Sequence, residues 1–85
     1  MVVPSYIKEY LNNPGYHFES EETEKELAPA FAQWRRDTER LFASCRNLKE
    51  VVRALDDHGT TIYERYGENR WAFDVDTDLA DFILY

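Results

Sequence analysis

Hydrophobic residues recur at steps of three and four along much of this chain, a spacing that predicts amphipathic helices. A first helix is predicted from Pro4 to Asn12, because proline suits the first turn of a helix and the Asn-Pro-Gly segment 13–15 suits a stop. A second helix is predicted to begin after Ser20, a good N-cap ahead of an acidic first turn. Its apolar stripe consists of Leu27, Phe31, Trp34, Thr38, Leu41 and Cys45.

Pro29 lies within this second stretch, where its ring would clash with the preceding helical turn. We therefore expect a break or a bend near Ala28. A third helix is predicted to start at the capping-box spacing of Asn47 and Glu50 and to end at Gly59.

The hydrophobic period changes to two between Thr60 and Val75, where β-branched and aromatic residues alternate with polar ones on both sides of the segment 67–69. This pattern predicts a β-hairpin. Trp71, Phe73 and Val75 share one face of its second arm, and we expect that face to cover the helices.

The end of the chain permits two structures. Thr77 suits the cap of a short final helix, whereas residues 82–85 have the composition of a third strand. The sequence therefore predicts a small single domain of the α+β class over residues 1–85, with two or three helices packed on a β-hairpin and a short C-terminal helix or strand.

The chain of 85 residues carries a formal net charge of −7, and the sign of the charge changes along it. Residues 1–32 and 54–85 are acidic, while residues 33–53 are basic. Charge governs partners more than it governs fold, so this arrangement is a clue to binding. One cysteine and no long apolar run or leader favour a cytoplasmic protein without a membrane segment.

Residue patterns that support catalysis are absent from the sequence. The two histidines have no partner at a metal-binding or catalytic spacing, and the three glycines are too scattered for a phosphate loop. Asp74, Asp76 and Asp78 have the spacing that opens an EF-hand calcium loop, but Leu79 and Tyr85 replace its required glycine and glutamate. We therefore expect a protein that is not an enzyme, with no catalytic residue, no metal site and no cofactor.

The carboxylates favour a binding role instead. On an extended strand, Asp74, Asp76 and Asp78 would lie about 6.6 Å apart, close to the roughly 6.8 Å that separates two phosphates along one DNA strand. We expect this phosphate-like row, together with Glu64 and Glu68, to meet basic residues of a partner. The same carboxylates also suit helix starts and solvated faces, which need no partner.

Six tyrosines are many for a core that already has two tryptophans and five phenylalanines. Tyrosine joins apolar area to a hydrogen-bonding tip, so some of the six are expected at an interface. The predicted anchors are Tyr63, Tyr66 and Tyr85.

These observations favour a small acidic, non-enzymatic protein that binds a protein partner and inhibits or modulates it. The partner is expected to be a nucleic-acid-binding enzyme or complex, because such proteins expose basic surfaces. In composition alone, the chain resembles phage or mobile-element inhibitors of the anti-CRISPR and DNA-mimic types.

Two other functions stay open. One is a small winged-helix-like transcriptional regulator or antitoxin module, a possible homodimer, that binds DNA through residues 47–75. It would use Lys49 and Arg53 on the helix and Arg65 or Arg70 on the wing, although the carboxylates of this segment make direct nucleic acid binding unfavourable. The other is an assembly component that docks through residues 82–85.

Overall fold

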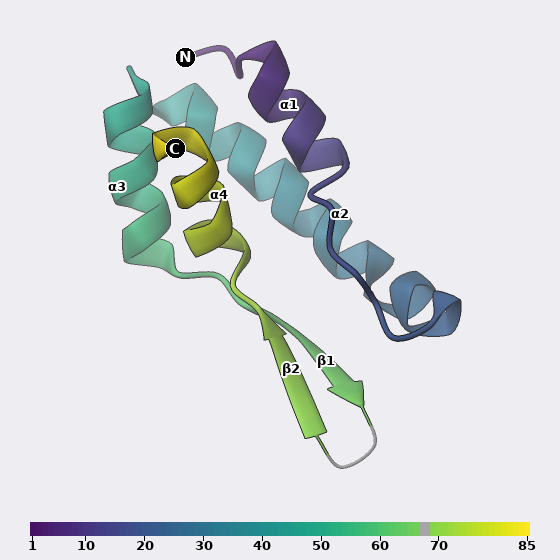
Figure 1. The fold of residues 1–85 in the computed structure, drawn as a ribbon. Helices are drawn as coiled ribbons and strands as arrows, with labels where there is room; N and C mark the ends of the chain where they lie inside the picture. Colours follow the sequence, from purple (N-terminus) through teal and green to yellow (C-terminus); the bar gives the residue numbers. More distant parts are fainter. Residues whose placement is uncertain (67–68) are drawn as a thin grey trace.

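The computed structural model describes residues 1–66 and 69–85. In this part of the chain, four helices and a two-stranded antiparallel sheet follow one another (Figure 1). Their bounds are α1 Ser5–Asn12, α2 Glu21–Ser44, α3 Leu48–His58, β1 Ile62–Tyr66, β2 Asn69–Phe73 and α4 Val75–Leu84. The predicted α+β class is confirmed, and the end of the chain forms a helix rather than a third strand.

The predicted caps fix the helix ends. Ser20 Oγ accepts a backbone N–H from the first turn of α2 at 3.2 Å, and Asn47 Oδ1 accepts the N–H of Glu50 at 3.0 Å. The Glu50 carboxylate bonds the N–H of Arg46 at 2.6 Å, one residue before the position that a full capping box would use. Gly59, with φ of 56°, ends α3 in the left-handed region that glycine adopts most easily.

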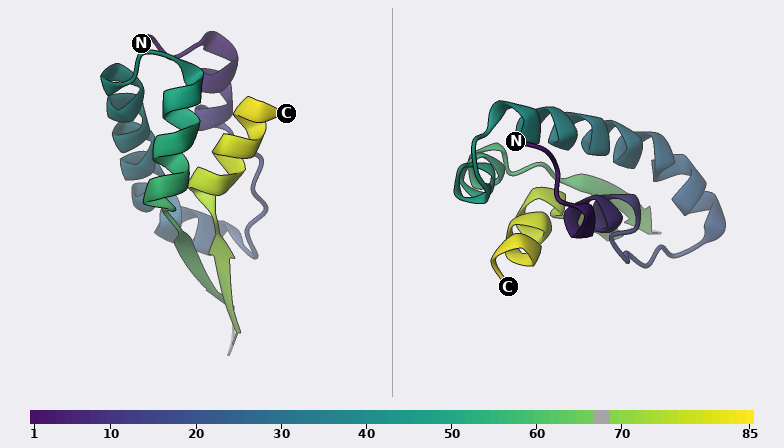
Figure 2. Two further views of the ribbon diagram at one scale, coloured as in Figure 1. Left: turned by 90° about the vertical axis from the view of Figure 1, so that its left-hand side faces the viewer. Right: turned by 90° about the horizontal axis from the view of Figure 1, so that it is seen from above.

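Helix α2 continues through Pro29, so the predicted break is wrong. Figure 2 shows that the axis of α2 turns at its N-terminal, blue end, in the part of the helix that contains this proline. A proline inside a helix removes one hydrogen bond and presses its ring against the carbonyl four residues earlier, which bends the helix. The expectation of a bend is therefore met without an interruption.

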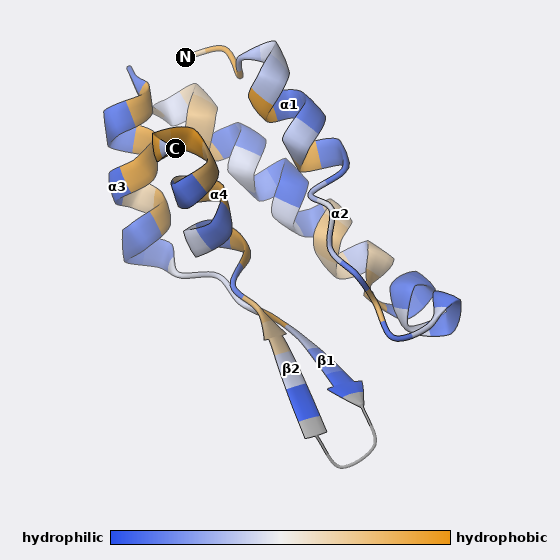
Figure 3. Ribbon diagram, in the orientation of Figure 1, coloured by the Kyte–Doolittle hydropathy of each residue, from blue (hydrophilic) through white to orange (hydrophobic). Residues whose placement is uncertain are grey.

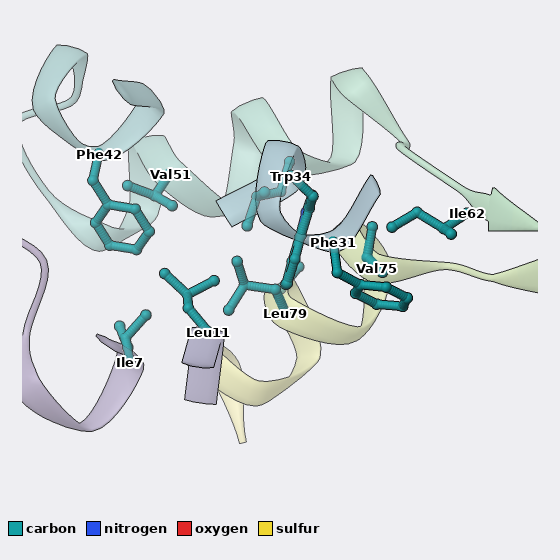
Figure 4. Packing of buried hydrophobic residues seen from close by; sticks show 11 residues of the cluster. Ile7, Leu11, Phe31, Trp34, Phe42, Val51, Ile62, Val75 and Leu79 are labelled. Atoms are coloured by element: carbon teal, nitrogen blue, oxygen red, sulfur yellow. The ribbon is translucent and has the colours of Figure 1, made fainter. Parts of the chain in front are cut away.

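The core lies where the four helices and the base of β1 meet. Figure 4 shows side chains from all of these elements converging on one apolar cluster. On the predicted stripe of α2, Phe31, Trp34 and Thr38 are buried and the other members are half-buried. The largest fully buried side chains are Phe42, Ile7, Leu11, Leu55, Leu79, Val51 and Val75.

The hairpin is anchored at its base and projects at its other end. Its antiparallel register places Ile62 opposite Phe73 and Glu64 opposite Trp71. Opposed residues share a face, so these four side chains lie on the face nearest the helices. Ile62 is buried and Phe73 packs against Phe31 with ring centroids 5.9 Å apart, which fixes the base of the hairpin to α2.

The prediction that Trp71 covers the helices is wrong, because its side chain is 59% exposed. The hairpin runs past the end of the helical part, as Figures 1 and 2 show, so that only its base has helices to cover. Val75, predicted on the same strand face, instead begins α4 and is buried there. The alternation along the strand is correct, but the helices do not cover the projecting part of the hairpin.

The molecule is elongated, with principal extents of 42 × 21 × 21 Å. Figure 3 shows hydrophobic residues where the hairpin meets the helices and more hydrophilic residues further along its strands. The projecting half of the hairpin is therefore the part of the fold that contributes least to the core.

Among the described residues, no helix combines the length and the apolar character that a membrane crossing needs.

Candidate functional site

A shallow groove of about 320 Å³ opens beside the projecting half of the hairpin. The residues that line it are His17, Phe18, Glu19, Glu64 and Trp71. They come from two segments that are distant in sequence, the chain that leads into α2 and the inner face of the hairpin. The groove combines two carboxylates with aromatic rings, which is the composition of a binding surface.

Phe18 holds the leading segment in place. Its ring packs edge-on against Phe31 at 5.6 Å between centroids and also contacts Phe73 at 5.4 Å. Such aromatic contacts stabilise the fold beyond the effect of the apolar area that they bury. The segment 17–19 is therefore fixed against both α2 and the hairpin, and the groove is a formed surface rather than a gap between loops.

Glu64 is a nearly buried carboxylate on the wall of this groove. The residue is 4% exposed, and its Oε1 accepts the backbone N–H of Glu19 at 3.2 Å. Buried carboxylates are ordinarily paired with cations or held by several donors. A carboxylate accepts about four hydrogen bonds, and among the described residues Glu64 accepts one, so it has capacity for further donors.

Trp71 is the second main feature of the groove. It lies directly opposite Glu64 on the inner face of the hairpin, and more than half of its surface is exposed to solvent. Tryptophan is among the residue types that contribute most to binding energy at protein interfaces. A large exposed indole beside an acidic wall therefore marks this face as a candidate contact surface.

The outer face of the hairpin has the opposite charge. Arg65 and Arg70 oppose one another across the two strands, and both are exposed. The guanidinium carbon of Arg70 lies 3.8 Å from the centroid of the Tyr63 ring, a cation–π contact. One side of the hairpin is thus acidic and aromatic, and the other is basic.

The predicted row of Asp74, Asp76 and Asp78 is not formed, because Asp76 and Asp78 lie in the first turn of α4 and not on an extended strand. Asp76 is 3% exposed and accepts the indole N–H of Trp34 at 2.9 Å. Asp78 accepts the hydroxyl of Tyr16 at 2.6 Å. Both carboxylates therefore have partners inside the protein.

Asp74 is exposed and occupies the N-cap position of α4, in place of the predicted cap Thr77. Its side chain makes no capping bond and instead accepts the hydroxyl of Thr61 at 3.1 Å. Of the three aspartates, Asp74 is exposed, Asp78 is half-buried and Asp76 is buried.

The structure separates the predicted anchors. Tyr63 is 49% exposed on the outer face of the hairpin, while Tyr85 is fully exposed after α4. Figure 1 places the C-terminus and the projecting end of the hairpin at opposite ends of the molecule. Glu68 and the side chain of Tyr66 lie outside the described residues. The predicted site residues that the structure describes therefore do not form one surface.

Two tyrosines beside α4 have altered acidity. Burial raises the pKa of Tyr16 far above its ordinary value of 10.0, and the hydrogen bond to the carboxylate of Asp78 raises it further. Burial also raises the pKa of Tyr10. Tyr10 on α1 stacks on Phe82 of α4 at 4.2 Å between centroids, whereas Tyr16 follows α1 in the chain and contacts the rings of Phe31 and Phe73.

The groove itself is not apparent from the sequence. By its pattern Trp71 is a core residue, Glu19 is one of the residues of the acidic segment 1–32, and His17 and Phe18 carry no signal of a site. The alternation along the second strand does place Trp71 on the face of Glu64, once the hairpin register is known. The pattern of residues does not indicate how much of the hairpin the helices leave uncovered, and this length decides whether Trp71 is exposed.

No group of three or more His, Cys, Asp and Glu side chains within residues 1–66 and 69–85 is arranged to hold a metal ion. Comparison of the chain with protein-family models, with curated proteins and with solved structures gave no match.

Proposed function

We propose that this protein is a non-enzymatic binding protein that attaches to a protein partner through the inner face of its hairpin and modulates or inhibits it. The observation that carries this proposal is the 59% exposed Trp71 beside the carboxylates of Glu19 and Glu64. An exposed tryptophan supplies an apolar anchor, and the carboxylates select a basic partner surface.

The acidic first turn of α2 extends this surface. Glu21, Glu22 and Glu24 follow directly after the groove segment, and all three are exposed. Like-signed charges around a cleft steer an oppositely charged partner toward it and raise the association rate. A partner with a basic face, such as a nucleic-acid-binding enzyme, fits this arrangement. The aspartate row of a DNA mimic does not contribute to this surface, because Asp76 and Asp78 have internal partners.

The test is capture of partners from native lysate on immobilised wild-type protein and on the variants Trp71→Ala and Tyr63→Ala, washed at low and then at high salt. Tyr63→Ala is the matched control, because it removes an exposed aromatic from the opposite face of the same hairpin. We expect a stoichiometric protein that salt releases, retained by wild type and Tyr63→Ala and lost from Trp71→Ala. Equal retention by all three would refute the proposal.

A second candidate function is DNA binding, and the basic outer face of the hairpin favours it. Arg65 and Arg70 lie directly opposite one another on this face, although like charges at such positions destabilise a sheet. A pair of this kind favours a role in binding an anion such as a DNA phosphate. Lys49 and Arg53 are exposed on α3, as a winged-helix reader of DNA requires, but Asp56 and Asp57 are exposed on the same helix. These carboxylates oppose a phosphate backbone, so this function ranks second.

Fluorescence anisotropy with a labelled DNA duplex tests the second candidate. A DNA-binding function requires affinity that falls steeply with salt and that is lost in Arg65→Glu with Arg70→Glu or in Lys49→Glu with Arg53→Glu. Absence of salt-dependent binding by the wild type would remove this candidate.

A further inference from the structure

We infer that the groove between Trp71 and Glu64 is a receptor for one arginine side chain of the partner protein. This inference rests on the proposed function, since it names the chemical group that the same site recognises. It follows from three properties of the groove: an aromatic wall, a carboxylate that keeps acceptor capacity, and an acidic surrounding.

The aromatic wall selects a flat cation. The indole of Trp71 is 59% exposed on the hairpin side of the groove, and the ring of Phe18 lies on the segment that leads into α2. Cations bind over the face of an aromatic ring, and tryptophan is the best of the aromatic residues at this. A guanidinium is planar and weakly hydrated, so it stacks on an indole at a smaller desolvation penalty than an ammonium.

The carboxylate wall selects a group with several parallel donors. Glu64 is directly opposite Trp71 in the hairpin, and one backbone N–H from Glu19 is bonded to its Oε1. A guanidinium has five N–H donors in a fixed fork and pairs with a carboxylate through two of them while it stacks. Burial of the Glu64 side chain limits competing water, which strengthens such a pair.

The outer face of the hairpin shows the same pairing inside this chain. There the guanidinium of Arg70 lies 3.8 Å from the centroid of the Tyr63 ring. The inner face presents an aromatic ring with a carboxylate beside it, and the described residues of the groove include no arginine or lysine. The groove therefore offers both contacts that a guanidinium makes, with the cation to be supplied by the partner.

The test uses N-acetyl-argininamide as the probe, titrated into isotope-labelled wild-type protein and followed by NMR. The two indole N–H signals separate the site from the core, because Trp34 is buried and bonded to Asp76 while Trp71 is exposed. We expect saturable shifts of the Trp71 indole and the Glu64 amide with a millimolar Kd, and no shift of the Trp34 indole. N-acetyl-citrullinamide, the uncharged isostere, is expected to bind at least about tenfold more weakly.

The matched variants are Glu64→Gln and Glu9→Gln, which make the same change of charge in the groove and on the exposed face of α1. Glu64→Gln keeps an oxygen for the N–H of Glu19 and is expected to weaken probe binding about tenfold. Glu9→Gln is expected to leave the affinity within about twofold, since surface charges at a distance are screened.

Equal responses to the arginine and citrulline probes, or no saturable shift at Trp71, would overturn the inference in the wild-type protein without any variant. If the lysate experiment still yields a protein that depends on Trp71, the proposed function stands and the arginine receptor alone is refuted. If arginine binds but no protein is captured, the receptor stands and the proposed function fails.

Discussion

The indole N–H of Trp34 donates to Oδ1 of Asp76 across 2.9 Å in the interior of the protein. The second oxygen of the same carboxylate accepts the backbone N–H of Thr60 at 2.9 Å. One nearly buried side chain therefore joins α2, the connection between α3 and β1, and the first turn of α4. These contacts lie where the hairpin leaves the helical part, so they help to set its direction.

Replacement of Asp76 by alanine is expected to lower the free energy of unfolding by about 2 to 4 kcal/mol. The substitution leaves the buried indole N–H of Trp34 and the partly buried backbone N–H of Thr60 without an acceptor, and it removes packed atoms. Chemical denaturation measures the change. Asp81→Ala is the control on the exposed side of the same helix and is expected to change stability by less than about 0.5 kcal/mol. Equal losses in the two variants would show that the Trp34–Asp76 bond is not important for the fold.

Stability is expected to decrease at alkaline pH because of Tyr16 and Tyr10. The folded state holds their protons more tightly than the unfolded chain does, since folding raises both pKa values above 10.0. The stabilisation that each tyrosine proton contributes is fully present below pH 10. It is lost as the pH rises above 10, because the tyrosines of the unfolded chain ionise first.

The measurement is the free energy of unfolding of wild type and Tyr16→Phe between about pH 8 and pH 11. The variant has no proton to lose at this position, so its free energy of unfolding is expected to decline less steeply above pH 10 than that of wild type. Tyr85→Phe serves as the control, because Tyr85 is fully exposed. A decline in Tyr16→Phe as steep as that of wild type would contradict the assignment.

Replacement of Pro29 by alanine is expected to raise the stability of the protein by about 1 to 3 kcal/mol. Pro29 is exposed inside α2, so the substitution removes no buried contact, restores one N–H donor to the helix and relieves the clash with the preceding turn. Thermal denaturation followed by circular dichroism measures the effect. A loss of stability would mean that the bend of α2 is needed for packing of its N-terminal part.

The two tryptophans are expected to differ in their effect on folding. Trp34→Ala removes a buried ring with a hydrogen bond and should lower the free energy of unfolding by about 3 to 5 kcal/mol. Trp71→Ala removes a ring that is 59% exposed and should lower it by less than about 1 kcal/mol. A large loss in Trp71→Ala would indicate a structural role and would weaken the argument that this residue is kept for binding.

Local signals predicted the secondary structure well. The cap residues Ser20 and Asn47, the end of α3 at Gly59 and the alternation in the hairpin all act over a few residues, and each is found as expected. The continuation of α2 through Pro29 is not predictable from local signals, because the contacts of a long helix outweigh the local penalty of one proline. Local signals do not distinguish a final helix from a strand either, because residues 82–85 suit both.

The candidate site could be predicted only in part, because burial depends on tertiary structure. Asp76 and Asp78 look like surface charges in the sequence, yet the indole of Trp34 and the hydroxyl of Tyr16 reach them from elements far away in the chain. Trp71 looks like a core residue and is exposed because the hairpin extends beyond the helices. The general expectation of acidic and aromatic contacts remains a proposal, and of the predicted residues that the structure describes only Glu64 lines the proposed groove.

The most direct test of this account is the affinity of the captured partner, once purified, for wild type, Trp71→Ala and Tyr63→Ala, measured by calorimetry at one salt concentration. We predict that Trp71→Ala binds at least about thirtyfold more weakly, as expected for loss of a hot-spot residue, while Tyr63→Ala stays within about threefold of wild type. Equal affinity of wild type and Trp71→Ala, with both folded, would contradict the claim that the inner face of the hairpin is the partner-binding site.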